Sequence, residues 1–297
     1  MSAPVRSILF VPGDSERKIE KSRASGADAI VLDLEDSVAQ ARKAIARETV
    51  ATLLRDGARA DKMAYWVRIN PIDTPDALHD LAAIVAGRPA GILLPKAQSP
   101  ADVAQLSLYL DALEIRDDIA PGSIPIMPVA TETARAPLTL HHYPDAALPR
   151  LFGITWGAED LSSALGASSN KDDDGRLSLS YRVARSLTLM AAKACGVEAI
   201  DTVYPDFRDL DGLKRDSLAS RREGFTGRFA IHPDQVEIIN AAFSPTSDEI
   251  AWSQQVVAAF AAAPDAGVVA LDGKMLDMPH LKQARHILAL SDAHMTA

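Results

Sequence analysis

The sequence predicts an α/β protein, specifically a (β/α)8 barrel with a helical extension at its C-terminus. Eight short apolar, β-branched runs recur about 20 to 50 residues apart, and stretches with helical spacing separate them. Each run ends at polar or charged residues. Such alternation predicts parallel strands joined by helices, and eight units favour closure into a barrel that carries its functional groups on one rim.

The predicted strands share an apolar, β-branched composition and are followed by polar residues. They are residues 7–11, 28–32, 65–67, 91–94, 124–129, 151–156, 198–203 and 228–231. The predicted helices between them are residues 15–25, 37–55, 75–86, 99–114, 133–141, 178–195 and 209–223. An open, doubly wound sheet is the alternative, but neither a dinucleotide-binding glycine motif nor a P-loop occurs in the sequence. We therefore expect residues 1–233 to form a catalytic barrel domain.

The strand rhythm stops after residue 232, so residues 234–297 are predicted to be a helical extension or lid. Helices are expected at about 234–241, 247–263 and 279–291, with a loop at 267–277 before the last one. An amphipathic extension must cover its apolar face, either on its own barrel or, as we expect, on an adjacent subunit. A second polar segment, residues 168–176, is either a mobile lid or a solvated loop.

Composition narrows the functional class. A chain of 297 residues with 47% hydrophobic residues can bury one large core. The net charge of -9 and the pI near 5.3 argue against nucleic acids and anionic membranes as main partners. No apolar stretch approaches the roughly 20 residues of a membrane helix. The single cysteine, Cys195, cannot form an intrachain disulfide, which suits a reducing compartment, so a cytoplasmic protein is predicted.

Six carboxylates occupy equivalent positions directly after predicted strands. They are Asp33, Glu35, Asp36, Glu132, Glu159 and Asp160. Such a crowd of negative charge is tolerable around a divalent cation, and Mg2+ typically takes one or two protein carboxylates together with water and substrate oxygens. Glu132 and Asp160 follow neighbouring strands, so we predict that they are the Mg2+ ligands. The alternative for any one of the six is a helix cap or an ion-pair partner.

Basic residues lie beside these acids in the predicted barrel. Arg68 falls within a strand, where a guanidinium is costly to bury unless it meets an anion such as a small carboxylate substrate. A structural salt bridge from Arg68 to Asp33 or Glu35 is the alternative. Lys96 and Lys43 could orient the acids or form only surface ion pairs. His232, at the end of the eighth run, could act as an acid or base or be purely structural.

Seven motifs, in order along nearly the whole chain, resemble those of one known family. They are residues 9–14, 26–38, 67–71, 132–134, 157–161, 231–233 and 271–277. In these motifs the chain resembles the citrate lyase beta subunit-like branch of the HpcH/HpaI aldolase superfamily. The resemblance implies a Mg2+-dependent lyase that cleaves or forms C–C bonds in 3-hydroxyacyl-CoA thioesters such as malyl-, citramalyl- or citryl-CoA. The other products would be an acyl-CoA, such as acetyl-CoA, and a 2-keto acid.

The resemblance also assigns roles to individual residues. It implies that Glu132 and Asp160 hold Mg2+ and that Arg68 is a catalytic residue that clamps the carboxylate of the keto acid. It implies a homotrimer or hexamer in which Asp272 acts as acid or base in the active site of an adjacent subunit. The groups expected around the metal and Arg68 are Asp33, Glu35, Asp36 and Lys96.

Three alternatives stay open for the function. An acyl-CoA thioesterase or a malate-synthase-like enzyme could use the same residues, because hydrolysis can follow formation of an enolate. The chain could also act only as a citrate lyase beta subunit, within a complex that contains an acyl-carrier protein. The sequence does not fix which acyl-CoA is the substrate, because a few pocket side chains decide that choice.

Overall fold

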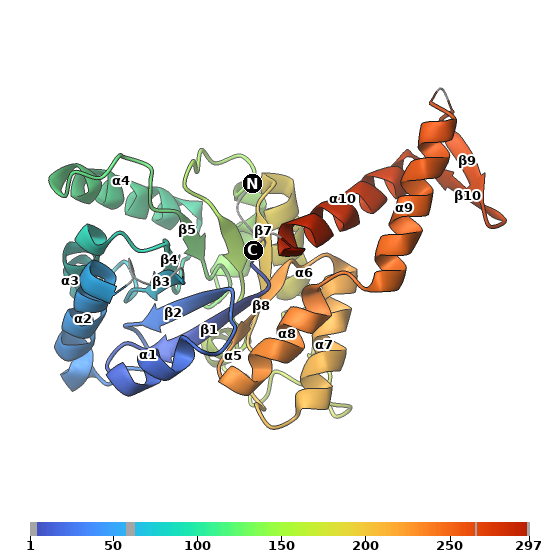
Figure 1. Cartoon of the computed structure of the whole chain (residues 1–297). Coiled ribbons are helices and arrows are strands. Elements are labelled where there is room, and N and C mark those ends of the chain that lie inside the picture. The colour runs from blue at the N-terminus through green and yellow to red at the C-terminus, as the bar shows by residue number, and fades with distance from the viewer. Residues whose placement is uncertain (1–4, 58–62, 265, 296–297) are drawn as a thin grey trace.

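The computed structural model describes residues 5–57, 63–264 and 266–295, and it contains the predicted barrel (Figure 1). Its parallel strands are β1 (Ser7–Pro12), β2 (Ala29–Asp33), β3 (Ala64–Arg68), β4 (Gly91–Leu94), β5 (Ile126–Pro128), β6 (Gly153–Thr155), β7 (Glu198–Asp201) and β8 (Gly227–Ala230). Each coincides with a predicted run. The strand order is β5-β4-β3-β2-β1-β8-β7-β6, and every pair within it is parallel.

Backbone hydrogen bonds close this sheet between β5 and β6. The amide of Ile126 donates to the carbonyl of Arg150 at 2.8 Å, and the amide of Phe152 donates to the carbonyl of Ile126 at 2.9 Å. Farther along, the amide of Ala130 donates to the carbonyl of Thr155 at 2.9 Å. The first and last strands of the sheet order therefore meet, and the predicted (β/α)8 barrel is confirmed.

Helices surround the barrel. They are α1 (Glu16–Ser22), α2 (Lys43–Thr52), α3 (Pro75–Ile84), α4 (Pro100–Arg116), α5 (Ala158–Leu165), α6 (Leu179–Cys195), α7 (Leu210–Glu223) and α8 (Val236–Phe243). Short 3-10 helices span Gln40–Arg42, Val85–Gly87, Ala136–His142 (η4) and Pro233–Gln235, and a π turn spans Leu53–Gly57. The stretch predicted as a helix at 133–141 is thus a 3-10 helix. Helix α5 was not predicted, because its single amphipathic stretch is short and directly follows a strand.

Helix ends follow from the local sequence. Pro75 and Pro100 begin α3 and α4, where a missing N–H costs nothing, and the Ser99 hydroxyl accepts a hydrogen bond from the amide of Ala101. Helices α6 and α7 end at Gly196 and Gly224, whose φ angles of 71° and 116° favour glycine. These residues give α3 and α4 a defined start and α6 and α7 a defined end.

Two apolar layers make up the core of the barrel. The inner layer fills the barrel with alternate strand residues, which include Ile8, Val31, Trp66, Leu93, Met127 and Phe229. The larger outer layer lies between the sheet and the helices and contains the other strand positions, such as Ile30, Val67 and Ile92. The apolar side chains of the inner layer fill the barrel below the carboxyl ends of the strands, where the polar residues lie.

The part of the extension nearest the barrel is α8, whose Val236, Ile239 and Phe243 are buried in the outer layer. The tail that follows, residues 247–295, contains α9 (Ser247–Ala262), β9 (Val268–Leu271), β10 (Lys274–Asp277) and α10 (Met278–Met295). In Figure 1, α9 leads away from the barrel and α10 returns toward it, with the two strands at the far end. No helix in the described part of the chain is long and apolar enough to cross a membrane.

The prediction of a loop at residues 267–277 is wrong, because this stretch is a β-hairpin. Strands β9 and β10 pair antiparallel across Asp272 and Gly273, whose φ angles are 47° and 73°. Asp-Gly is a preferred sequence for such a two-residue turn. Leu276 of the hairpin packs with Val256 and Phe260 of α9 and Leu281 of α10 in a small separate core. The tail therefore has its own apolar centre.

Candidate active site

A cavity of about 250 Å³ lies at the mouth of the barrel, where the strands end. The polar and charged residues that line it are Asp33, Ser37, Arg68, Glu132, Thr155, Glu159, Asp160 and Thr202. Its apolar lining includes Phe10, Val129, Trp156, Val203, Phe229 and Ile231. Four of the predicted site residues thus share one cavity: Asp33, Arg68, Glu132 and Asp160. The carboxyl ends of the strands are where barrel enzymes carry their active sites.

Arg68 is held by two buried acids. Its Nε and Nη2 donate to the two oxygens of Asp33 at 2.7 and 2.6 Å, and its Nη1 lies 2.8 Å from Glu35 Oε2. Burial opposes the charge on Arg68, but the hydrogen bonds and charge of Asp33 raise the pKa of Arg68 above its ordinary value. The pKa of Asp33 is lowered, because hydrogen bonds from Arg68 outweigh the effect of burial. The structural salt bridge therefore exists, and Arg68 still faces the cavity.

Lys96 joins the acids of three strand ends. Its Nζ forms a hydrogen bond with Glu35, lies 2.8 Å from Asp36 Oδ2 and is 3.5 Å from Asp160 Oδ1. Its backbone amide donates to Glu132 Oε2 at 2.6 Å. Lys96 has a φ of 53°, a conformation that an L side chain rarely adopts. The contacts made by its amide and its ammonium group hold this strained residue in place.

Glu132 is buried directly after β5 and lies against Gly157. A methyl group at position 157 would lie 2.8 Å from Glu132 Cγ and 3.0 Å from Glu132 Oε1, which only glycine avoids. Burial, together with the negative charges of Asp160 and Glu35, raises the pKa of Glu132 to about 8. A buried carboxyl with a raised pKa beside other acids is a typical site for a cation.

The residues present fit a Mg2+ ion. Glu132 and Asp160 offer carboxylate oxygens to the same cavity, as Mg2+ prefers. Glu35, held by the ion pairs with Arg68 and Lys96, lies beside this pair of carboxylates. Within the described ranges, no three His, Cys, Asp or Glu side chains form a ligand group. A pair of carboxylates completed by water and substrate is the usual Mg2+ arrangement.

Other candidates of the sequence lie outside this cavity. Asp272 is exposed at the turn of the tail hairpin and does not line the cavity of its own chain. The Nζ of Lys43 donates to the backbone carbonyls of Leu34 and Glu35, at 2.9 and 3.1 Å. His232 stacks on Phe207 with 5.0 Å between ring centroids. Cys195 is a half-buried free thiol at the end of α6.

Sequence reasoning missed Trp156 and Gly157, which form the wall of the cavity between β6 and α5. Gly157 precedes α5, and Glu159 and Asp160 lie in the first turn of that helix. The signal was present as a glycine followed by two acids, a pattern typical of a helix start. Glu159 does not reach the acids around Lys96 but accepts a hydrogen bond from Asn170 of the 168–176 loop, at 2.9 Å.

A closed (β/α)8 barrel with a charged cavity at the carboxyl ends of its strands is the architecture of barrel enzymes. The chain belongs to the HpcH/HpaI aldolase/citrate lyase family, which matches residues 6–233. Individual proteins of this family are similar to the chain over nearly its whole length.

The chain is 35% identical to citramalyl-CoA lyase, mitochondrial, of Rattus norvegicus over 97% of this chain and 86% of that protein. It is also 35% identical to (3S)-malyl-CoA thioesterase of Cereibacter sphaeroides over 98% of this chain and 95% of that protein. A similar solved structure is protein CitE from Mycobacterium tuberculosis in complex with magnesium, acetoacetate and coenzyme A. It has a TM-score of 0.80 at 33% identity, covering 98% of this chain and all of the other.

Proposed function

We propose that the protein is a Mg2+-dependent carbon-carbon lyase. It would cleave, or in reverse form, a 3-hydroxyacyl-CoA such as citramalyl-, malyl- or citryl-CoA, giving acetyl-CoA or another acyl-CoA and a 2-keto acid. The observation that carries this proposal is the grouping of Glu132, Asp160 and Arg68 around one cavity. The similarity to citramalyl-CoA lyase and to CitE crystallised with magnesium and coenzyme A supports it. The proposed compartment is the cytoplasm, in keeping with the free thiol of Cys195.

Each charged residue at the cavity would have its own role in the reaction. Mg2+ bound by Glu132 and Asp160 would supply a Lewis acid at the 3-hydroxyl group of the substrate. Arg68, fixed by Asp33 and Glu35, would bind the carboxylate that becomes part of the keto acid. Lys96 would hold Glu35, Asp36 and Asp160 at a fixed spacing, because one ammonium group contacts all three.

The proton donor is proposed to come from a second copy of the chain. Asp272 would protonate the enolate carbon of the acyl-CoA during cleavage and remove that proton in the synthetic direction. Its position supports a role in another subunit, because it is exposed on a hairpin turn and does not line its own cavity. We therefore propose a homotrimer or hexamer with shared active sites, in which the tail, as an extension beyond the barrel domain, packs on its neighbour.

Exposed apolar side chains support self-association. Met275 on β10 is 78% exposed, next to the turn that carries Asp272. On the barrel, Leu108 of α4 and Leu138 of η4 are 69% and 74% exposed. Apolar surface of this kind on both the tail and the barrel would be covered if the tail of one copy packed on the barrel of another.

A thioesterase is the second candidate function. The relative from Cereibacter sphaeroides, described as a (3S)-malyl-CoA thioesterase, is as similar to this chain as the lyase from Rattus norvegicus. The same cavity could bind the same thioester, with water then attacking the thioester carbonyl. The two activities give different products, so a single product analysis distinguishes them.

The test is mass spectrometry of reactions with malyl-, citramalyl- and citryl-CoA, with Mg2+ and with chelator. Mg2+-dependent release of acetyl-CoA with glyoxylate, pyruvate or oxaloacetate is the expected result and names the substrate. Free CoA together with an intact hydroxy acid would identify a thioesterase instead. No reaction with any of the three would contradict a freestanding lyase for these substrates and favour a subunit that needs an acyl-carrier protein.

A further inference from the structure

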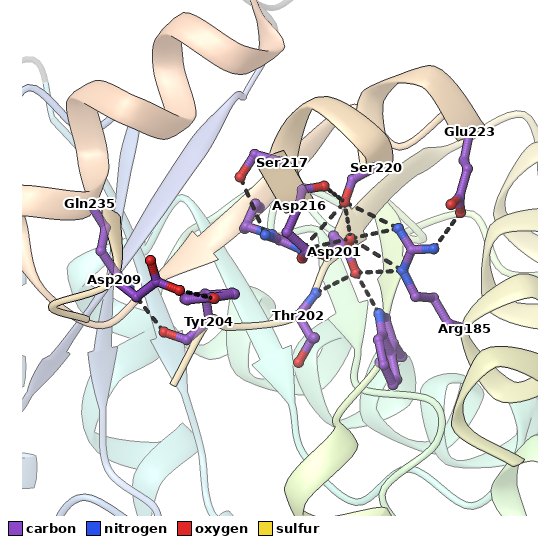
Figure 2. A network of polar contacts seen from close by, with 12 residues as sticks. Arg185, Asp201, Thr202, Tyr204, Asp209, Asp216, Ser217, Ser220, Glu223 and Gln235 are labelled. Carbon is purple, nitrogen blue, oxygen red and sulfur yellow. Dashed lines mark hydrogen bonds and ion pairs between the residues drawn. The ribbon is translucent and has the colours of Figure 1, made fainter. Parts of the chain in front are cut away.

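Directly behind the cavity lies a fully buried carboxylate that the proposed chemistry does not use. Asp201 ends β7 and has no exposed surface. Figure 2 shows side chains that converge on it, among them Arg185 of α6 and Ser220 of α7. A buried carboxylate in such surroundings is costly unless cations and donors satisfy it. Here ion pairs and hydrogen bonds satisfy both carboxylate oxygens of Asp201 and hold the side chain in one orientation.

Two arginines and a serine hold one side of Asp201. Arg185 Nη2 of α6 and Arg228 Nη2 of β8 each lie 3.0 Å from Asp201 Oδ2. The hydroxyl of Ser220 in α7 donates to the same oxygen at 2.5 Å. Charge from these arginines lowers the pKa of Asp201 below its ordinary value despite complete burial. The carboxylate is therefore charged and cannot turn without breaking several contacts.

The other oxygen of Asp201 faces the wall of the active cavity. Trp156 Nε1 donates to Asp201 Oδ1 at 2.6 Å, and the amide of Thr202 donates to it at 2.9 Å. Both Trp156 and Thr202 line the cavity described above. Trp156 is 2% exposed, and its indole N–H has this single acceptor among the contacts of the described chain.

Trp156 directly precedes Gly157, the residue that lies against Glu132. Gly157 lies closer to Glu132 Cγ than any side chain at that position would allow, and its amide donates to Thr131 Oγ1 at 3.0 Å. Asp160 follows in the first turn of α5. The β6–α5 junction that begins at Trp156 therefore carries Asp160 and, through Gly157, lies against Glu132.

We propose that Asp201 and Trp156 are positioning residues for the carboxylate pair Glu132 and Asp160. The ion-paired Asp201 fixes the Trp156 indole through one hydrogen bond, and the indole fixes the junction that carries Gly157 and Asp160. This inference rests on the proposed Mg2+ site and adds a determinant of its affinity, since groups behind metal ligands commonly change affinity by about 10- to 100-fold.

The test compares two variants that each remove one hydrogen bond from Asp201. Trp156→Phe removes the bond on the cavity side, and Ser220→Ala removes one on the helix side. Binding of Mn2+ to the full-length protein is measured by electron paramagnetic resonance, without substrate, next to thermal unfolding. We expect the Mn2+ dissociation constant to rise about 10-fold or more in Trp156→Phe and to stay near the wild-type value in Ser220→Ala, although both variants melt earlier.

Two results would overturn the inference in different ways. Equal Mn2+ affinity in wild type and Trp156→Phe would remove the positioning role and leave the Mg2+ site intact. Absence of Mn2+ binding in the wild type would remove the proposed function together with this inference. If Trp156→Phe does not fold, benzothienylalanine at position 156 keeps the ring shape and replaces only the N–H by sulfur, and the same two outcomes apply.

Discussion

Glu132 lies closer to Gly157 than any side chain at position 157 would permit. We predict that Gly157→Ala lowers Mg2+-dependent kcat/KM by about 10-fold or more, because the added methyl group would displace the Glu132 carboxylate from its ligand position. Steady-state kinetics at saturating Mg2+ checks this. Gly267→Ala is the matched control, since nothing lies within 4 Å of its added methyl group. Wild-type kinetics in Gly157→Ala would show that the close contact does not matter.

At the scale of residues, the sequence predicted the acids at the rim and left open which partner each one meets. A carboxylate after a β-branched run predicts a rim position, which is how Asp33 and Glu132 were found. Whether Arg68 meets a substrate or a protein carboxylate depends on distances between strands, and these are set by packing. The left-handed backbone conformation of Lys96 could not be predicted either. Its amide contacts Glu132, a residue 36 positions away, and such a contact depends on the packing of the strands.

Four elements meet at Asp201, and the contacts of its carboxylate make the free energy of unfolding depend on pH. The pKa of Asp201 is lowered in the folded state, so its contribution is fully present above the unfolded value of about 3.9 and is lost as the pH falls toward the folded pKa. Asp201→Asn should cost about 3–5 kcal/mol near pH 7, because Arg185 and Arg228 lose their shared acid. The difference from wild type should shrink below about pH 4.

Urea unfolding at several pH values between 3 and 7 measures this difference. Asp33→Asn is a useful comparison at the mouth of the barrel, because the pKa of Asp33 is also lowered and its partner is Arg68. A stability difference between wild type and Asp201→Asn that stays constant over this pH range would show that ionisation of Asp201 does not stabilise the fold.

At the scale of elements, all eight strands were predictable because each is short, apolar and followed by polar residues. The tail hairpin was missed, although Asp272 and Gly273 are a preferred turn pair, because exposed strands lack the apolar alternation that marks a buried sheet. Helix α5 was missed because eight residues give only two turns of periodicity. Both omissions lie beside proposed functional residues.

At the scale of the whole molecule, we predict that catalytic activity requires an adjacent subunit. Arg68→Ala and Asp272→Ala proteins should each be inactive alone, the first through lost carboxylate binding and the second through lost proton transfer. If Asp272 serves the adjacent cavity, mixing the two proteins should restore part of the activity, because some sites then combine an intact Arg68 with an intact Asp272. Turnover before and after subunit exchange is the measurement.

Subunit exchange must be verified by native mass spectrometry before the outcome is read. No recovery of activity in verified mixed oligomers would contradict shared sites. Full turnover by Asp272→Ala alone would show that Asp272 is not the acid or base. Mn2+ binding should be unchanged in Asp272→Ala, since the proposed metal ligands are Glu132 and Asp160 and not Asp272.

The central claim is that Glu132 and Asp160 hold the Mg2+ on which C–C cleavage depends. The most direct measurement is mass spectrometry of citramalyl-CoA incubated with wild type and Glu132→Gln across a Mg2+ titration. We predict Mg2+-dependent acetyl-CoA and pyruvate from the wild type, and loss of both products at all Mg2+ concentrations in Glu132→Gln. Equal product formation by the variant, or by the wild type in the presence of chelator, would contradict the claim.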